Sequence, residues 1–559
     1  MATTHERERR PQRRPQRLAL LVAAATAVGG AAVGAGASSV TAPLAVQRVV
    51  STPSAHNDVS APLRDMRVTW PARPGFSHEP PEAVPAARPH VRDAAVQSSA
   101  TASPSLQVLS TFHGISDGEH GYNVLMQGGL PPDTVGAVGT TQYVQMVNLA
   151  MAVFSKKGAL LLGPVPANQV WQGFGGDCQS HDDGDPIVLF DHLANRWVVT
   201  QFAISTGSSG NGSMECIAIS KTADATGGWY RYSFDYTKYG SINDYPKLGI
   251  MPAAYYMTYN FPGALVCAMA RTAMLAGKPA TQQCATAPGG LASLMPADLD
   301  GRVLPPKGEP EYLLEKAANS LNVFSFTVDW KHPGRSHLDK LSPLPVAPYN
   351  DACLVSAAPE VPNAYGCIPQ PGSGPSGYVS ALESTGDRLM FRLAYRRFAD
   401  GHESMVVNHA ASGGFPVGAV SGVRWYELSR RTGPWAVARQ AKQQATYAPD
   451  LNSRWEGSVA MDRLGDIAMG YSLSGPATFP SIALTGRLYG DPPGQMRAET
   501  VAVAGMGSQI IPRWGDYSAL TLDPTDDCTF WFTSEFLKLP GTFDWSTAVV
   551  SARFPGCHR

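Results

Sequence analysis

Residues 182–202 read DDGDPIVLFDHLANRWVVTQF, which is an acidic loop, a short apolar segment, a polar turn and a second apolar segment. The same order returns in WEGSVAMDRLGDIAMGY at 455–471 and in GDYSALTLDPTDDCTFWF at 515–532. In each turn an aspartate is followed four residues later by an Asp or Asn partner, giving the pairs Asp191/Asn195, Asp462/Asp466 and Asp523/Asp527. Short apolar segments around such turns are typical of β-hairpins, so the chain contains a repeated hairpin.

Similar pairs of segments can be placed along most of the chain, with starts that lie 52 to 79 residues apart. They occupy 133–148, 185–203, 244–260, 309–328, 377–395, 456–472 and 516–535. A period of about 60 residues with several short strands per unit is typical of β-propeller blades that carry loop insertions. We therefore predict an all-β β-propeller with seven blades, while six or eight blades and a β-sandwich are the alternatives.

The composition agrees with this fold class and excludes one class of partner. The 559 residues are 44% hydrophobic and 16% charged, and they include 55 Gly and 46 Pro. Abundant turn residues with few charges favour a globular protein rich in strands. The formal net charge is −1, whereas a nucleic-acid surface needs a strongly basic patch. We expect no nucleic-acid partner.

The N-terminus resembles an export signal. Several arginines precede an apolar run at 18–28, and Ala35-Gly36-Ala37 fits a small-residue cleavage site. We predict a signal peptide over 1–37, a disordered linker or propeptide over 38–105, and the β-propeller domain over 106–559. No later run is long and apolar enough to span a membrane, so the expected location is secreted or periplasmic.

The eight cysteines all follow residue 170, which fits an oxidising compartment. Eight cysteines allow 105 pairings in principle. A preference for short loops favours the set Cys178–Cys216, Cys267–Cys284, Cys353–Cys367 and Cys528–Cys557.

An acid recurs at the start of most units. It lies six residues before the turn position in five units and seven before it in the last, at Asp133, Asp185, Asp244, Glu309, Glu456 and Asp516. The first strand of a propeller blade lines the central axis, so these carboxyls are expected to converge. Converging carboxylates need a cation, a basic partner or raised pKa values. The alternative is that they only fix turns by bonding backbone N–H groups.

The cluster suggests two chemistries. As catalytic carboxyls we single out Asp185, Asp244, Glu456 and Asp516. As oxygen ligands for Ca²⁺, the one cofactor expected, we single out Asp133, Asp185, Asp244 and Asp516.

Arginines and aromatic residues accompany two of the acids, in Arg454-Trp455-Glu456 and in the RWGDY run at 513–517. Arg454 and Arg513 could bind an acidic ligand by paired hydrogen bonds. Trp455, Trp514 and Tyr517 could offer faces for sugar rings. The alternative is an Arg–acid pair with a tryptophan buried between blades.

Three runs, PPDTVG at 131–136, DGDP at 183–186 and RWGDY at 513–517, resemble a group of large secreted bacterial β-propeller proteins, most of which have no assigned activity. The chain is also distantly similar to sialidase-like propellers, although it lacks their Ser-x-Asp-x-Gly-x-x-Trp box. The resemblance implies the architecture over residues 106–557 and only weakly a sialidase-like activity.

Two functions follow as hypotheses. The first is a glycoside hydrolase that acts on an extracellular glycan through the acidic mouth of the channel. The second is a non-catalytic, calcium-stabilised module that binds a glycan or a protein outside the cell. A structural surface protein, in which the acids only form turns, is the third interpretation.

Overall fold

The computed structural model describes residues 49–70, 91–104, 106–117, 129–205, 212–261, 263–289, 293–352, 366–373, 380–414, 420–437, 443–541 and 544–558. All of them belong to the unit Ala45–Arg559. Strands dominate these residues, which confirms the all-β prediction. The predicted signal peptide lies outside the described residues.

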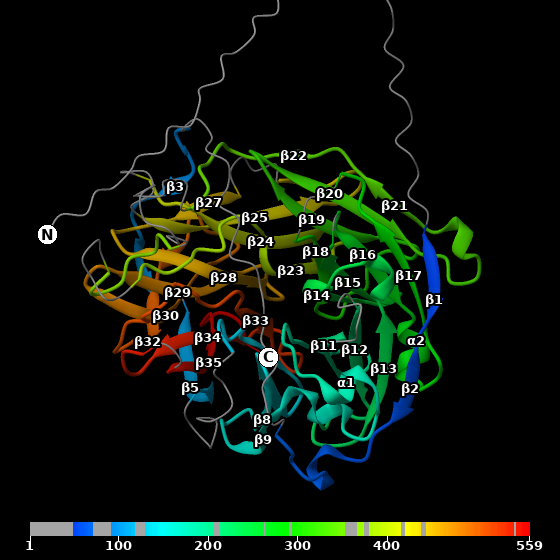
Figure 1. The fold of residues 1–559 in the computed structure, drawn as a ribbon. Helices are drawn as coiled ribbons and strands as arrows, with labels where there is room; N and C mark the ends of the chain where they lie inside the picture. Colours follow the sequence, from blue (N-terminus) through cyan, green and yellow to red (C-terminus); the bar gives the residue numbers. More distant parts are fainter. Residues whose placement is uncertain are drawn as a thin grey trace, which may run out of the picture. The chain divides into compact units, whose positions relative to one another are not determined.

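Five sheets are built around an antiparallel meander (Figure 1). The first is β6 (Val135–Val138), β7 (Gln142–Val147), β8 (Ala150–Ser155) and β9 (Leu160–Pro166). The second is β10 (Ile187–Asp191), β11 (Arg196–Ser205), β12 (Gly212–Ser220) and β13 (Trp229–Asp235). The third is β14 (Asp244–Met251), β15 (Ala254–Asn260), β16 (Leu265–Met269) and β17 (Thr281–Thr286). The others are β28 (Ser453–Met461), β29 (Ile467–Gly475), β30 (Thr478–Arg487) and β32 (Thr500–Val503), and β33 (Ala519–Leu522), β34 (Phe530–Leu537) and β35 (Trp545–Arg553) with β5 (Gln107–Ser116).

A larger sheet joins two further meanders. One contains β18 (Met295–Asp300), β19 (Glu311–Ala317), β20 (Ser320–Thr327), β21 (His337–Lys340) and β22 (Leu344–Pro345). The other contains β23 (Met390–Arg397), β24 (Glu403–Ser412), β25 (Ser421–Arg430), β26 (Ala436–Val437) and β27 (Gln444–Tyr447). They are linked because β18 pairs in parallel with β23, from Ala297 opposite Leu393 to Asp300 opposite Arg396.

The first strands of successive meanders contact one another in chain order and return to the start. The cycle runs β6, β10, β14, β18, β23, β28, β33 and back to β6. The last sheet is completed by β5, which comes from before the first meander and pairs antiparallel with β35. A closed cycle of sheets whose last member borrows a strand from the other end of the chain is the arrangement of a β-propeller.

Two short α-helices, α1 (Asp177–Ser180) and α2 (Arg271–Leu275), lie in connections. The 3₁₀ turns are η1 (Leu63–Asp65), η3 (Ala167–Trp171), η4 (Thr237–Tyr239) and η5 (Pro333–Arg335). No helix in the described part of the chain is long and apolar enough to cross a membrane.

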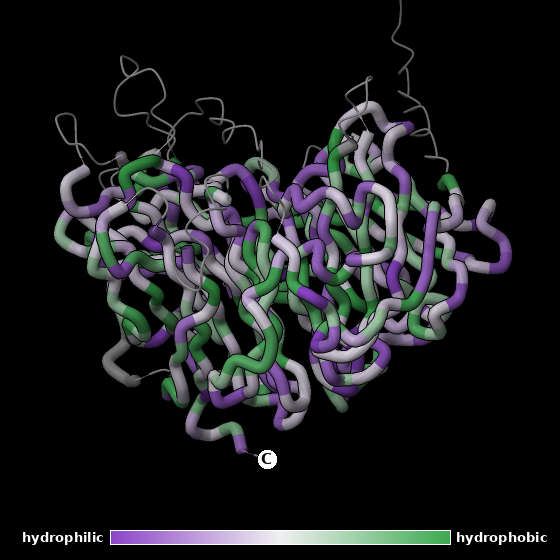
Figure 2. The backbone as a smooth tube through the Cα atoms, turned by 60° about the horizontal axis from the view of Figure 1, so that its bottom comes forward, coloured by the Kyte–Doolittle hydropathy of each residue, from purple (hydrophilic) through white to green (hydrophobic). Residues whose placement is uncertain are grey.

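The sheets are buried on both faces, which explains the continuous apolar runs in the sequence. Every residue of β10 is buried, for example, because neighbouring sheets pack on each side of it. Hydrophobic stretches lie along the interior strands, whereas many connections are hydrophilic (Figure 2).

The predicted disulfides Cys178–Cys216, Cys267–Cys284 and Cys528–Cys557 are present. They link residues that the packing of strands and turns already brings together, with Cα–Cα distances of 4.1 to 5.8 Å. The predicted Cys353–Cys367 pair cannot be followed because Cys353 lies outside the described residues.

The segment expected to be disordered at 38–105 instead contributes strands where it is described. β1 (Val50–Pro53) pairs with β17, and β2 (His56–Val59) pairs with β13, at the outer edges of two sheets (Figure 1). β3 (Val96–Gln97) pairs with β27, and β4 (Thr101–Pro104) with β31 (Arg497–Ala498). Such edge strands face solvent and need little apolar sequence, so periodicity does not reveal them.

The positions of two predicted units were wrong. The 377–395 segment contains only the start of β23, whose hairpin partner β24 begins at Glu403. The 309–328 segment forms β19 and β20, whereas the first strand of that meander is β18, which begins at Met295. The residue at the start of this meander is Ser293, which is not an acid, so the recurring-acid pattern pointed to Glu309 instead.

Gln145 joins the two ends of the ring. Its Oε1 accepts the Ile115 N–H at 2.7 Å, and its Nε2 donates to Thr533 and Thr547 at 2.7 and 2.9 Å. Gln145→Leu is expected to lower the unfolding free energy by about 2 kcal/mol, because it leaves the buried Ile115 N–H without this partner. Chemical denaturation measures the change.

Gln107→Leu is the matched control, since Gln107 lies on the same β5 strand and is exposed. We expect it to change the unfolding free energy by less than about 0.5 kcal/mol. Equal effects of the two substitutions would contradict a closing role for Gln145.

Candidate functional site

A residue in the left-handed backbone region stands at or just before the first strand of each meander. These residues are Asp133 (φ 50°), Asp185 (48°), Tyr245 (51°), Ser293 (58°), Thr385 (47°), Glu456 (48°) and Asp516 (66°). Aspartate tolerates this conformation better than most residues, which explains why an acid recurs there. Asp244 lies one position earlier than the equivalent acids, and Glu309 lies elsewhere.

Three of these carboxyls, those of Asp185, Asp244 and Asp516, lie close enough for their charges to interact. Burial, followed by the charge of Asp244, raises the pKa of Asp185 to about 8. Burial, followed by the charge of Asp516, also raises the pKa of Asp244. We call these three residues the acid cluster. Asp185 is therefore mostly protonated at pH 7 and can act as a proton donor.

Each carboxyl of the acid cluster has an oxygen without a hydrogen-bond partner among the described residues, namely Asp185 Oδ1, Asp244 Oδ1 and Asp516 Oδ2. The second oxygen of Asp185 accepts the Tyr245 N–H at 3.0 Å. Asp185 and Asp516 are buried, while Asp244 is half-buried. Buried carboxyl oxygens are costly to leave unbonded, so the cluster is suited to receiving a hydroxyl or another donor.

Two cationic side chains balance the acids. The fully buried Lys247 Nζ lies 3.3 Å from the centre of the Tyr245 ring and 4.1 Å from that of Tyr517. Its charge lowers the raised pKa values of Asp185 and Asp244. The Arg388 guanidinium lies 4.5 Å from the centre of the Tyr245 ring, and its charge also lowers the raised pKa of Asp244. An ammonium among carboxylates and aromatic faces is well stabilised.

Lys247 also bears on the predicted calcium site. No group of three or more His, Cys, Asp or Glu side chains in the described part of the chain is arranged to hold a metal ion. Asp133, one of the predicted ligands, bonds through its backbone N–H to the Gly515 carbonyl at 3.0 Å. We infer that Lys247 supplies here the positive charge that was expected of a Ca²⁺ ion.

Contacts between meanders hold the cluster in place. Asn148 Oδ1 accepts the Asp185 N–H at 3.0 Å, and Tyr517 donates its hydroxyl to the Pro186 carbonyl at 3.1 Å. Thr385 donates to the predicted catalytic residue Glu456. A Cβ atom at Gly515 would lie 2.8 Å from the Glu456 side chain, so this loop needs glycine to approach so closely.

The predicted ligand-binding arginines have carboxylate partners within the protein. Arg454 is fully buried, with Nε 2.9 Å from Glu499 and Nη1 3.0 Å from Asp450. Arg513 lies 3.2 Å from Glu383, which also accepts the Trp514 N–H. Arg454 therefore stabilises its own sheet, whose edge contributes Glu499, and does not join the acid cluster.

The predicted stacking faces are buried. Trp455 and Trp514 are 0% exposed and pack with ring centres 5.9 Å apart, and Tyr517 is 1% exposed. These rings fill the contact between neighbouring sheets, so the expectation that they stack on a sugar from solvent is wrong for the two tryptophans. Tyr517 contributes instead by covering Lys247.

Sequence reasoning missed Lys247, Arg388 and Tyr245. The signal for Lys247 was available, because the residue is a charge inside the buried strand β14. Arg388 lies before β23, in the one predicted unit that has no acid at its start, so the recurring acid did not point to it.

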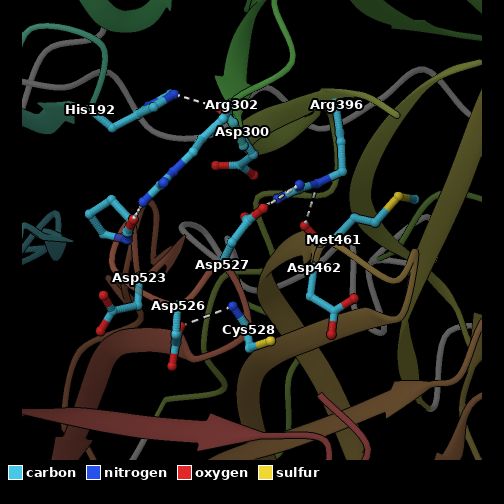
Figure 3. A network of polar contacts seen from close by, with 12 residues as sticks. His192, Asp300, Arg302, Arg396, Met461, Asp462, Asp523, Asp526, Asp527 and Cys528 are labelled. Atoms are coloured by element: carbon cyan, nitrogen blue, oxygen red, sulfur yellow. Dashed lines mark hydrogen bonds and ion pairs between the residues drawn. The ribbon is translucent and has the colours of Figure 1, made fainter. Parts of the chain in front are cut away.

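At the opposite end of the first strands, charged side chains bond to one another and to the backbone (Figure 3). There Arg396 pairs with Asp527, with Nη1–Oδ2 at 2.9 Å, and His192 bonds the Gly301 carbonyl at 2.6 Å. The turn acids bond their own turns: Asp462 accepts the Leu464 N–H at 2.8 Å, for example. These contacts stabilise the turns, although Asp462 Oδ2 has no partner among the described residues and burial raises the pKa of Asp462 to about 7.

No protein family and no curated protein matches the sequence. Among solved structures, a PL25 ulvan lyase has 10% identity and a TM-score of 0.30 over 73% of this chain and 91% of its own. The N-terminal domain of Nup159 has 9% identity and a TM-score of 0.31 over 82% and 99%. An α-L-arabinofuranosidase from Podospora anserina has 10% identity and a TM-score of 0.29 over 76% and 98%. Likenesses this low do not assign an activity to this chain.

The raised pKa of Asp185 predicts a pH-dependent stability. The folded protein holds a proton on Asp185 that the unfolded chain releases between about pH 4 and pH 8. The stability from this group is thus fully present below about pH 4 and is lost as the pH rises through 8. Asp185→Asn should make the decline in unfolding free energy over this range shallower by about 1 kcal/mol per pH unit.

Denaturant unfolding at several pH values measures the slope. Asp339→Asn is the control, because this carboxylate is 52% exposed and distant in sequence from the acid cluster. A slope unchanged by Asp185→Asn would show that Asp185 is not held protonated.

The positive charge of Lys247 among the acids leads to a further expectation. Excess EDTA should leave the melting temperature unchanged within about 1 °C, because only a metal bound to the folded state would make the melting temperature depend on a chelator. A marked loss of stability in EDTA, restored by Ca²⁺, would contradict the role given to Lys247.

Proposed function

We propose that the protein is an extracellular, seven-bladed β-propeller that acts on a glycan through the acid cluster. The seven first strands of the closed cycle support the blade number. The three disulfides fit an oxidising compartment. The observation that carries the proposed activity is the convergence of three carboxyls with unpartnered oxygens around a buried lysine.

Glycoside hydrolysis needs two carboxyls in different protonation states. One donates a proton to the leaving oxygen, and the other acts as base or nucleophile. Asp185 is suited to the first role because its pKa of about 8 keeps the proton available at neutral pH. Asp516 or Asp244 would take the second role, and Lys247 would stabilise the carboxylate form.

Asp244 and Arg388 are half-buried, so we infer that a substrate reaches the cluster from their side. A substrate hydroxyl or ring oxygen that reaches the unpartnered Asp244 oxygen would enter beside the Arg388 guanidinium. Because Asp185 and Asp516 are buried, the cluster suits a small part of a polymer, such as one sugar unit, better than a protein surface. The alternative of a non-catalytic module predicts binding of the same glycan without turnover.

The test is release of reducing ends from a panel of neutral and acidic polysaccharides by the mature protein. Asp185→Asn and Asp516→Asn should each lower the rate on the active substrate by about 100-fold or more, as expected for loss of an acid or base. Glycan binding without any turnover in the wild type would favour the non-catalytic alternative.

Glu311→Gln is the matched control. Glu311 is also a buried carboxyl with two oxygens that lack partners among the described residues, but it lies in β19, outside the acid cluster. The Glu311→Gln variant should release reducing ends at a rate near that of the wild type. Equal losses in all three variants would show that the effect comes from folding and would contradict the proposed roles.

A further inference from the structure

A cavity of about 970 Å³ lies outside the acid cluster, between the meander of β23–β27 and that of β28–β32. Its lining includes Ser404, Glu427 and Trp435 from one meander, and Arg487 and Tyr489 from the end of β30 and the following loop. Pro492 and Pro493 complete one wall. We call this space the Arg487 cavity.

Arg487 is the unusual group of this cavity. Its side chain is 1% exposed, and only Nη2 is engaged, donating to the Asp491 carbonyl at 2.7 Å. Nε and Nη1 have no partner among the described residues. Burial lowers the pKa of Arg487 from its ordinary value, although the group remains a cation. Two unbonded donors on a buried guanidinium are costly unless an acceptor binds to them.

The acids around Arg487 already have other partners. Both oxygens of Glu427 accept hydrogen bonds at 2.9 Å, from Ser404 and from Gln443. The carboxylate of Asp491 pairs with Arg497 at 2.7 Å. Neither bonds to the free donors of Arg487. The lining also contains Arg430 and Arg431, but Arg430 pairs with Glu309 and Glu403, and Arg431 pairs with Asp400. Arg487 is therefore the cation of the lining that has donors left for an anion.

The rim and wall of the cavity offer surfaces for a ring. Tyr489 is 64% exposed, which is unusual for an aromatic residue on this scaffold. Trp435 is 4% exposed, its Nε1 lacks a partner among the described residues, and its ring lies 4.3 Å from the Arg430 guanidinium. An exposed aromatic ring beside buried donors suits a ligand with one apolar face and one charged group.

We propose that the Arg487 cavity binds an acidic sugar unit of a polysaccharide, with its anionic group on Arg487 and its ring on Tyr489. The proposal is independent of the activity of the acid cluster, because it concerns binding at a separate place. The anionic group of this sugar is either a carboxylate or a sulfate. The probes below distinguish these two groups.

The test is calorimetric binding of three probes to the mature protein: oligogalacturonate, a sulfated dextran oligosaccharide and the neutral dextran oligosaccharide. We expect one acidic probe to bind at least about 10-fold more tightly than the neutral probe. Tyr489→Ala should weaken this binding about 10-fold, and Arg487→Gln should remove the preference for the acidic probe.

Two further variants serve as controls. Leu539→Ala removes a similarly exposed apolar side chain, 68% exposed and not part of the cavity lining, and Asp339→Asn changes an exposed carboxylate outside it. Both should bind as the wild type does. Failure of both acidic probes to bind more tightly than neutral dextran, or wild-type affinity in Tyr489→Ala, would overturn the proposal. If Arg487→Gln does not fold, Tyr489→Ala, with its exposed side chain, still decides the outcome.

Discussion

The pairing of β5 with β35 is the contact on which the rest of the structure depends. The ring closes where its last sheet packs against its first, in a hydrophobic cluster that includes Val138, Tyr143 and Trp531. Here a strand from before the first meander completes the last sheet, and the side chain of Gln145 ties that strand to β34 and β35. Only when this seam is closed do β33 and β6 lie side by side and bring Asp516 near Asp185.

Closure explains the electrostatics of the axis. Each first strand brings a polar residue in a left-handed conformation to the same region, and carboxyls would repel one another there. The chain limits the repulsion in two ways: Asp185 holds a proton, and Lys247 and Arg388 supply positive charge between aromatic rings. Farther along the first strands, carboxylates form direct ion pairs with arginines, for example Asp298 and Asp300 with Arg392.

The sequence predicted what local patterns control. The repeated hairpin predicted the class of fold, and the recurring acid identified Asp185 and Asp516, because backbone conformation at a strand start selects Asp locally. It did not predict Lys247, whose role depends on three segments far apart in the chain. It also assigned Trp455 and Trp514 to a binding surface, since burial between sheets depends on how neighbouring meanders pack. The pattern also selected Glu309 wrongly, because the residue that stands just before the first strand of its meander is Ser293, which is not an acid.

The strands β1 and β2 have a consequence for processing of the chain. Each covers the outermost strand of a different sheet, β17 and β13, whose free backbone groups would otherwise face solvent. A protease that removed the segment up to residue 105 would uncover both edges at once. Bare sheet edges recruit strands from other molecules, so the trimmed protein would tend to assemble edge to edge. With β1 and β2 in place, the edges are strands of four residues each, which offer fewer free backbone groups than the seven residues of β13 and the six of β17.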